Sequence, residues 1–137
     1  MKIMKPIVNS RIGKLYNVII PFYDKASHRV LVKARPCMIL DEPKGRDKEY
    51  VILPISSSLN KKYYNECFDV LLCKDDYPKL ELVKDSYLRT HKQTTAYEPN
   101  IDFKRCLGDL KEDYSDTFIM ILDKVKEYDE YKIKSSR

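Results

Sequence analysis

The chain is poor in the residues and motifs that mark several large protein classes. It has three Gly and no Trp among 137 residues. No apolar run approaches the roughly 20 residues that a membrane-spanning helix needs, so we expect no membrane partner. The segment from Met1 to Pro6 lacks the apolar stretch of a signal peptide, which predicts a cytoplasmic protein. A glycine-rich phosphate loop and a GxSxG nucleophile motif are also missing, which counts against the common nucleotide-binding and hydrolase families.

The sequence also lacks the residue spacings that are typical of a metal site. The four cysteines form no CxxC pair, and no histidine stands at ligand spacing from them. A zinc site needs four clustered nitrogen or sulfur ligands, so we predict no metal site and no cofactor. The cysteines are then expected to be free intracellular thiols: Cys37, Cys67, Cys73 and Cys106.

What the chain does have is an uneven distribution of charge. Between Met1 and Lys62 there are 13 Lys and Arg against 5 Asp and Glu, whereas from Tyr63 to Arg137 there are 13 against 16. A basic half attracts phosphates or an acidic protein partner through its long-range field. A solvated lysine-rich surface explains the same charge equally well, so a polyanionic partner is an open hypothesis at this point.

Apolar runs of strand length dominate the first two thirds of the sequence. Gly13 precedes the first run, Pro21 is expected to end it, and Pro36 is expected to interrupt or bend the second. Short strands at this spacing predict a mainly β fold built as an antiparallel barrel. The expected strands cover residues 14–20, 30–40, 49–55, 68–72 and 86–90.

The last third changes to helical periodicity. Residues 102–110 predict a short helix ended by Gly108, and Ser115 or Asp116 is the expected N-cap of a second helix. That helix should pack on the barrel through an apolar stripe made of Phe118, Ile121, Leu122, Val125 and Tyr128. Residues 132–137 are expected to form a frayed tail, and residues 1–137 a single domain.

Four polar side chains stand out as candidates for phosphodiester chemistry. Arg35 precedes Pro36 and Ser56 ends the third expected strand, while Arg89 and His91 are two apart and should face the same way. Arginine forks bind phosphate at two points, and histidine transfers protons near neutral pH. A solvated strand face is the plain alternative for Arg89 and His91.

The order of these motifs resembles the MazF/PemK family of bacterial toxins. The match covers nearly the whole chain and rests on an ordered set of short motifs. These are Gly13 with the strand after it, Arg35-Pro36 with the apolar residues 37–40, the run 51–57 ending in Pro-Ile-Ser-Ser, the segment 82–88 with Asp85-Ser86, and Gly108-Asp109-Leu110 before the last helix.

The resemblance implies an SH3-like antiparallel β-barrel with a C-terminal helix, acting as a metal-independent endoribonuclease on single-stranded RNA. Arg35, Ser56, Arg89 and His91 would be the catalytic residues. Substrate contacts would come from Asp24, His28, Ser57, Lys61 and Lys62. It also implies a homodimer that an acidic antitoxin inhibits.

The chain departs from the family pattern in the loop before Arg35 and after the Ser86 strand, where an arginine is missing. A non-catalytic barrel that binds nucleic acid or a protein is therefore a second hypothesis. A hydrolase built on the serine run at Ser56 is a third.

Overall fold

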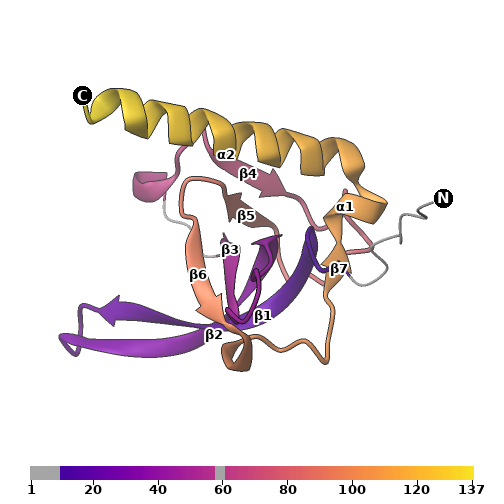
Figure 1. Ribbon diagram of the computed structural model, residues 1–137, viewed down its shortest axis with the longest axis horizontal. Helices are drawn as coiled ribbons and strands as arrows, with labels where there is room; N and C mark the ends of the chain where they lie inside the picture. The colour runs from indigo at the N-terminus through magenta and orange to yellow at the C-terminus, as the bar shows by residue number, and fades with distance from the viewer. Residues whose placement is uncertain (1–9, 58–60) are drawn as a thin grey trace.

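The computed structural model describes residues 10–57 and 61–137, and these form a curled antiparallel sheet with a helix lying across it (Figure 1). The sheet has seven strands in the order β4-β5-β3-β2-β1-β7, and β6 also pairs with β3. The predicted mainly β fold with a C-terminal helix is confirmed. The elements are β1 (Lys14–Asp24), β2 (Arg29–Asp41), β3 (Glu49–Ser56), the 3-10 helix η1 (Lys61–Tyr63), β4 (Asp69–Leu72), β5 (Ser86–Arg89), β6 (Thr94–Tyr97), the 3-10 helix η2 (Glu98–Asn100), β7 (Gly108–Asp109), α1 (Leu110–Asp113) and α2 (Ser115–Ser135).

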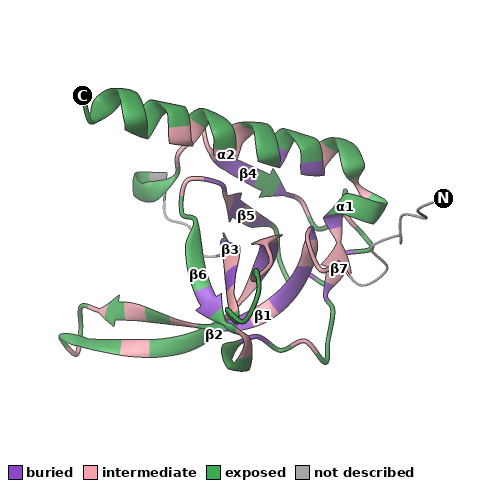
Figure 2. Ribbon diagram, viewed as in Figure 1, coloured by how far each residue is buried: buried purple, intermediate pink, exposed green. Residues whose placement is uncertain are grey.

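Strand alternation divides the core into two layers. In β1 the side chain of Leu15 enters the layer beneath α2, where Phe118 and Ile121 of the helix pack, whereas those of Tyr16 and Val18 enter the other layer. Figure 2 shows that the buried residues gather where the sheet curls. The layer beneath α2, called the helix-side layer, includes Leu15, Met38, Leu53 and Ile55, and the second layer includes Tyr16, Val18, Cys37, Ile39 and Ile52.

The longest strands differ from their predicted ends. β1 does not stop at Pro21 but runs to Asp24, and Pro21 lies opposite Val32 in the β1–β2 register. Beyond the Val18–Ile101 bridge, no further described strand pairs with the outer edge of β1, and proline is tolerated on such an edge. The break in β2 pairing falls between Ile39 and Asp41 rather than at Pro36.

The predicted helix over residues 102–110 is wrong. Backbone N–H groups of this segment donate instead to β1, from Asp102 to Asn17 O (2.9 Å) and from Leu107 to Leu15 O (2.8 Å), so the chain lies along a strand edge. Burial of Ile101 and Leu107 against the core outweighs the local helical preference.

The start and end of α2 also differ from expectation. Tyr114, rather than Ser115 or Asp116, occupies the N-cap position, and its side chain makes no capping hydrogen bond. The helix includes residues 132–135 of the predicted frayed tail. Lys132 helps to hold this last turn, since its Nζ lies 3.4 Å from Asp129 Oδ1. Among the described residues, no helix has both the length and the apolar character to cross a membrane.

Candidate functional site

Three of the four predicted catalytic residues line one groove. Cys37 pairs with Pro54 in the antiparallel β2–β3 register, so extending that register by two residues places Arg35 across from Ser56. Arg89 ends β5, the strand that pairs with the other edge of β3 at Ser56. The side chains of Arg35, Ser56 and Arg89 meet at a hollow of about 430 Å³. The structure therefore brings together side chains from three strands, although Arg35 and Arg89 are more than fifty residues apart in the sequence.

The groove is cationic with an apolar wall. It continues the second core layer outward, since Ile20 and Phe22 follow Tyr16 and Val18 on the same face of β1. The described residues that line it include no carboxylate and no imidazole. Arg35 makes no ion pair with any described carboxylate. Its guanidinium is therefore available to an anion in the groove. The described lining residues are Ile20, Pro21, Phe22, Arg35, Pro54, Ser56, Tyr63, Arg89, Lys92 and Thr94.

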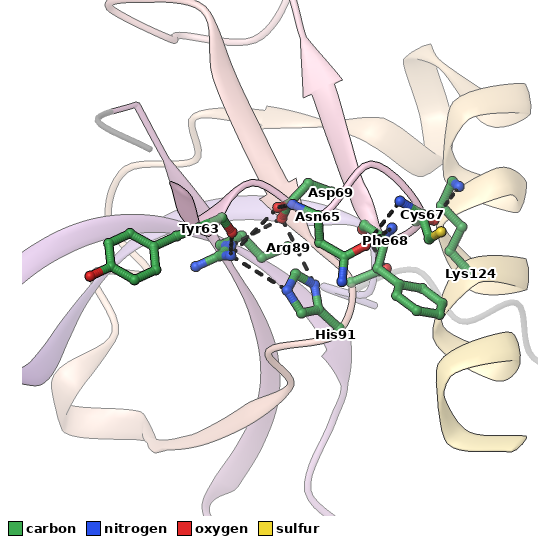
Figure 3. A network of polar contacts seen from close by, with 9 residues as sticks. Tyr63, Asn65, Cys67, Phe68, Asp69, Arg89, His91 and Lys124 are labelled. Atoms are coloured by element: carbon green, nitrogen blue, oxygen red, sulfur yellow. Dashed lines mark hydrogen bonds and ion pairs between the residues drawn. The ribbon is translucent and has the colours of Figure 1, made fainter. Parts of the chain in front are cut away.

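Arg89 is held in place by a buried carboxylate (Figure 3). Its Nε donates to Asp69 Oδ1 at 3.0 Å, and its Nη2 donates to the Tyr63 carbonyl at 2.9 Å. The Asp69 side chain is fully buried and the Arg89 side chain 17% exposed. Asp69 Oδ2 also accepts the backbone N–H of Asn65 at 2.8 Å. Such a satisfied buried pair fixes the direction of the guanidinium toward the groove.

His91 faces the same pair from the other side. Its Nε2 lies 3.4 Å from Nη2 of Arg89. Since arginine can only donate, Nε2 is the acceptor and the ring proton sits on Nδ1. Nδ1 is buried 3.8 Å from Asp69 Oδ1 and makes no hydrogen bond within the described chain. Burial lowers the pKa of His91 and Arg89 lowers it further, although the nearby Asp69 acts in the opposite direction. The imidazole is therefore neutral at neutral pH.

A second hollow adjoins the groove on the side of His91. Its volume is about 550 Å³, and it shares Tyr63, Arg89 and Lys92 with the groove. His91 lines it, and the His91 ring packs against both Phe68 and Tyr128 of α2, at centroid distances of 6.0 and 5.9 Å. The two hollows form one continuous basic track, and Arg89 stands at their junction.

The predicted substrate-binding residues are less concentrated. Asp24 and His28 lie at the tip of the β1–β2 hairpin, which projects away from the sheet (Figure 1). The carboxylate of Asp24 accepts the Ser27 hydroxyl at 2.6 Å, which lowers its pKa and fits a turn-forming role. Ser57 lines a small separate hollow with Arg35. Lys62 lines the His91 hollow, and the side chain of Lys61 lies outside the described part of the chain.

Sequence reasoning missed two residues that line this track and one that supports it. Tyr63 and Lys92 line both hollows, and Asp69 is buried behind them and pairs with Arg89; none of the three stood in a recognisable motif. A signal for Asp69 existed, because an acidic residue within an apolar strand is buried only when it is paired. Arg89 was its available partner, since it ends β5, whereas His91 lies in the turn after that strand.

No protein-family model matches the sequence, and no curated protein matches it either. Over residues 10–57 and 61–137, no three His, Cys, Asp or Glu side chains cluster as metal ligands.

Proposed function

We propose that this chain is a metal-independent endoribonuclease of the MazF/PemK type, built on an SH3-like barrel and acting on single-stranded RNA. One observation carries the proposal. Arg35, Ser56 and Arg89, which the resemblance names as catalytic, line a single groove that has cations but no carboxylate among its described lining residues. An RNA phosphate is the anion that such a groove attracts. The same resemblance supports a cytoplasmic toxin that an acidic antitoxin inhibits.

In the proposed reaction the RNA supplies its own nucleophile. The ribose 2′-oxygen forms a bond to the adjacent phosphorus, and the bond from that phosphorus to the 5′-oxygen breaks. The products are a 2′,3′-cyclic phosphate and a 5′-hydroxyl end. Arg35 stabilises the added negative charge of the phosphorane, and the Ser56 hydroxyl donates to a phosphate oxygen.

Proton transfer depends on the Arg89–His91 contact. The 2′-hydroxyl loses a proton and the leaving 5′-oxygen gains one, and an imidazole suits both steps. In the free protein, Nη2 of Arg89 donates a hydrogen bond to Nε2, the acceptor nitrogen of His91. A bound phosphate that draws Nη2 toward itself frees Nε2 of His91 to take the proton. The lowered pKa keeps the imidazole in its accepting form.

The burial of His91 favours one alternative function. Its side chain is only 8% exposed and Arg89 holds its acceptor nitrogen, so the described groove walls present no free base. A barrel that retains this arrangement with substrate bound would hold RNA without cutting it. Arg35 and Arg89 would then serve as phosphate contacts.

Incubation of the purified chain with mixed-sequence RNA in EDTA tests both functions. We expect products with cyclic-phosphate and 5′-hydroxyl ends. Arg35→Ala should reduce cleavage about 10²–10³-fold, the usual loss for one electrostatic donor. Arg46→Ala is the matched control because Arg46 is an exposed basic residue in the turn before β3, and it should cleave normally. Full activity of a folded Arg35→Ala variant would overturn the site, and RNA binding without any cleavage would favour the alternative.

A further inference from the structure

Two neighbouring tyrosines are exposed beside the basic track. Tyr63 and Tyr64 both line the His91 hollow, and the two residues are 52% and 42% exposed. Tyr63 also lines the groove that holds Arg35, and the Tyr64 ring packs on Tyr87 with the ring centroids 5.0 Å apart. The chemistry proposed for the groove uses neither ring. Exposed aromatic rings next to phosphate-binding cations are the combination by which proteins hold single-stranded nucleic acid.

The backbone that carries these rings is fixed by the network around Asp69. The Tyr63 carbonyl accepts a hydrogen bond from Nη2 of Arg89 at 2.9 Å, and the backbone N–H of Asn65 donates to Asp69 Oδ2 at 2.8 Å. Figure 3 shows the Tyr63 ring pointing away from these contacts. The ring is therefore held in a set position relative to Arg89, which reduces the entropy that a ligand must give up on binding.

The charges of the two hollows differ, and this difference assigns them different parts of a nucleotide. The groove has no carboxylate among its described lining residues, whereas the His91 hollow contains Glu66. A carboxylate repels a phosphate, but it accepts hydrogen bonds from the N–H groups on the edge of an uncharged base. We therefore expect a phosphate in the groove and a base in the His91 hollow.

Asn65 supplies a hydrogen-bond donor for such a base. Its Oδ1 accepts the backbone N–H of Cys67 at 2.9 Å and that of Phe68 at 3.2 Å. The oxygen of this amide is therefore occupied, whereas its Nδ2 makes no hydrogen bond with the described residues, and Asn65 lines the hollow. An amide N–H pairs with the ring nitrogens and carbonyl oxygens of bases.

We propose that the His91 hollow binds one unstacked base of single-stranded RNA, with the rings of Tyr63 and Tyr64 as the stacking platform. The inference rests on the proposed function for its RNA, because the groove has to hold the adjoining phosphate. It adds a base site to that function, since none of the substrate contacts implied by the resemblance is a tyrosine. Stacking accepts every base, so any preference among bases has to come from Asn65 and Glu66.

Fluorescence anisotropy with a labelled 2′-O-methylated RNA of mixed sequence tests the site. This RNA has no free 2′-hydroxyl, so the proposed reaction does not cleave it. We expect Tyr63→Ala/Tyr64→Ala to raise the dissociation constant roughly 10–100-fold, the usual loss when a stacking ring is removed. Tyr63→Phe/Tyr64→Phe should bind like the wild type because it keeps both rings. Tyr97→Ala is the matched control, since Tyr97 is 58% exposed but lines neither hollow.

Two further measurements separate stacking from phosphate binding. The dependence of log Kd on log salt concentration should be unchanged in Tyr63→Ala/Tyr64→Ala, whereas Arg35→Ala should lower its slope by about 0.7, the value for one phosphate contact on a single strand. An abasic oligomer of the same length should bind the wild type and Tyr63→Ala/Tyr64→Ala equally. Circular dichroism should give the same folded spectrum for all variants, and Tyr63→Ala alone replaces the double variant if that variant does not fold.

Four results would overturn the base site. They are unchanged RNA affinity in folded Tyr63→Ala/Tyr64→Ala, an equal loss in the Phe variant, an equal loss with the abasic oligomer, and a wild type that does not bind the methylated RNA. Cleavage of unmodified RNA in EDTA is measured separately. A Tyr63→Ala/Tyr64→Ala chain that binds and cleaves like the wild type refutes the base site and leaves the ribonuclease in place. A wild type that never cleaves, but loses RNA binding with the two rings, refutes the ribonuclease and leaves the base site in place.

Discussion

The Asp69–Arg89 pair gives a sharp test of how the site is built. Asp69→Asn keeps the shape of the side chain and removes its charge, so Arg89 retains a neutral partner in place of a carboxylate. Breaking a buried ion pair costs about 3–5 kcal/mol, and a charge-assisted hydrogen bond contributes about 1.5–3 kcal/mol. The Asp69 carboxylate is fully buried, but the 17% exposure of Arg89 lets water compensate part of the loss. We therefore expect the free energy of unfolding to fall by about 2–4 kcal/mol.

Urea unfolding followed by circular dichroism measures this change. With a urea dependence in the ordinary range for small proteins, the midpoint should fall by about 1–2 M. Glu81→Gln is the matched control, because Glu81 accepts from Arg105 Nη2 at 2.8 Å while both side chains are more than half exposed. An exposed pair of this kind contributes at most about 1 kcal/mol.

The comparison of the two variants decides the argument. If Asp69→Asn changed stability no more than Glu81→Gln, burial would not strengthen the pair and the reasoning would be refuted. A double-mutant cycle with Arg89→Gln isolates the interaction. We expect a coupling of about 1–3 kcal/mol between the two positions, as found for contacting residues in one network. A coupling near zero would show that Asp69 acts through Asn65 instead of Arg89.

Two further predictions concern strain and pH. Gly13→Ala should destabilise the protein by at least ~2 kcal/mol more than Gly45→Ala in the same urea assay. Both glycines have a positive φ, +90° and +66°, but an added Cβ at Gly13 would lie 2.5 Å from Lys111 Cβ, whereas Gly45 has open space. The pKa of His91 is lowered in the folded protein, so as the pH drops below 6.5, the ordinary pKa of histidine, the unfolded chain binds more protons than the folded chain. Stability therefore falls as pH drops through that value. His91→Gln should remove this part of the loss, up to about 1 kcal/mol between pH 7.5 and 5.5, and an unchanged pH dependence in the variant would contradict it.

The strands were predictable where their apolar residues are buried. The runs at 49–55 and 68–72 each fall within a residue of an observed strand end, because burial and local preference agree there. β1 was predicted too short because Pro21 reads as a strand breaker, and only the unpaired edge makes it acceptable. The helix predicted over residues 102–110 does not form, because backbone N–H groups of this segment donate hydrogen bonds to β1, a strand far away in sequence.

The candidate residues that line the groove could be predicted from the sequence, but the contacts that hold them in place could not. Ser56 ends β3 and Arg35 lies in β2 just before its pairing with β3 begins, and the antiparallel register of two consecutive strands brings such positions together. The Asp69–Arg89 contact joins residues 20 apart through the β4–β5 register, which no local pattern encodes. The exposure of Val30 and Val32 could not be predicted either, because a strand of apolar residues is ordinarily buried.

The two arginines of the groove have different electrostatic roles. Asp69 neutralises much of the field of Arg89 and fixes its direction, whereas no described carboxylate pairs with Arg35. Arg35 therefore supplies the larger share of the attraction for a phosphate, and Arg89 supplies a fixed orientation. It follows that Arg35→Ala should lose RNA affinity or cleavage while unfolding like the wild type. Asp69→Asn should lose stability and groove geometry together, because one buried carboxylate serves both.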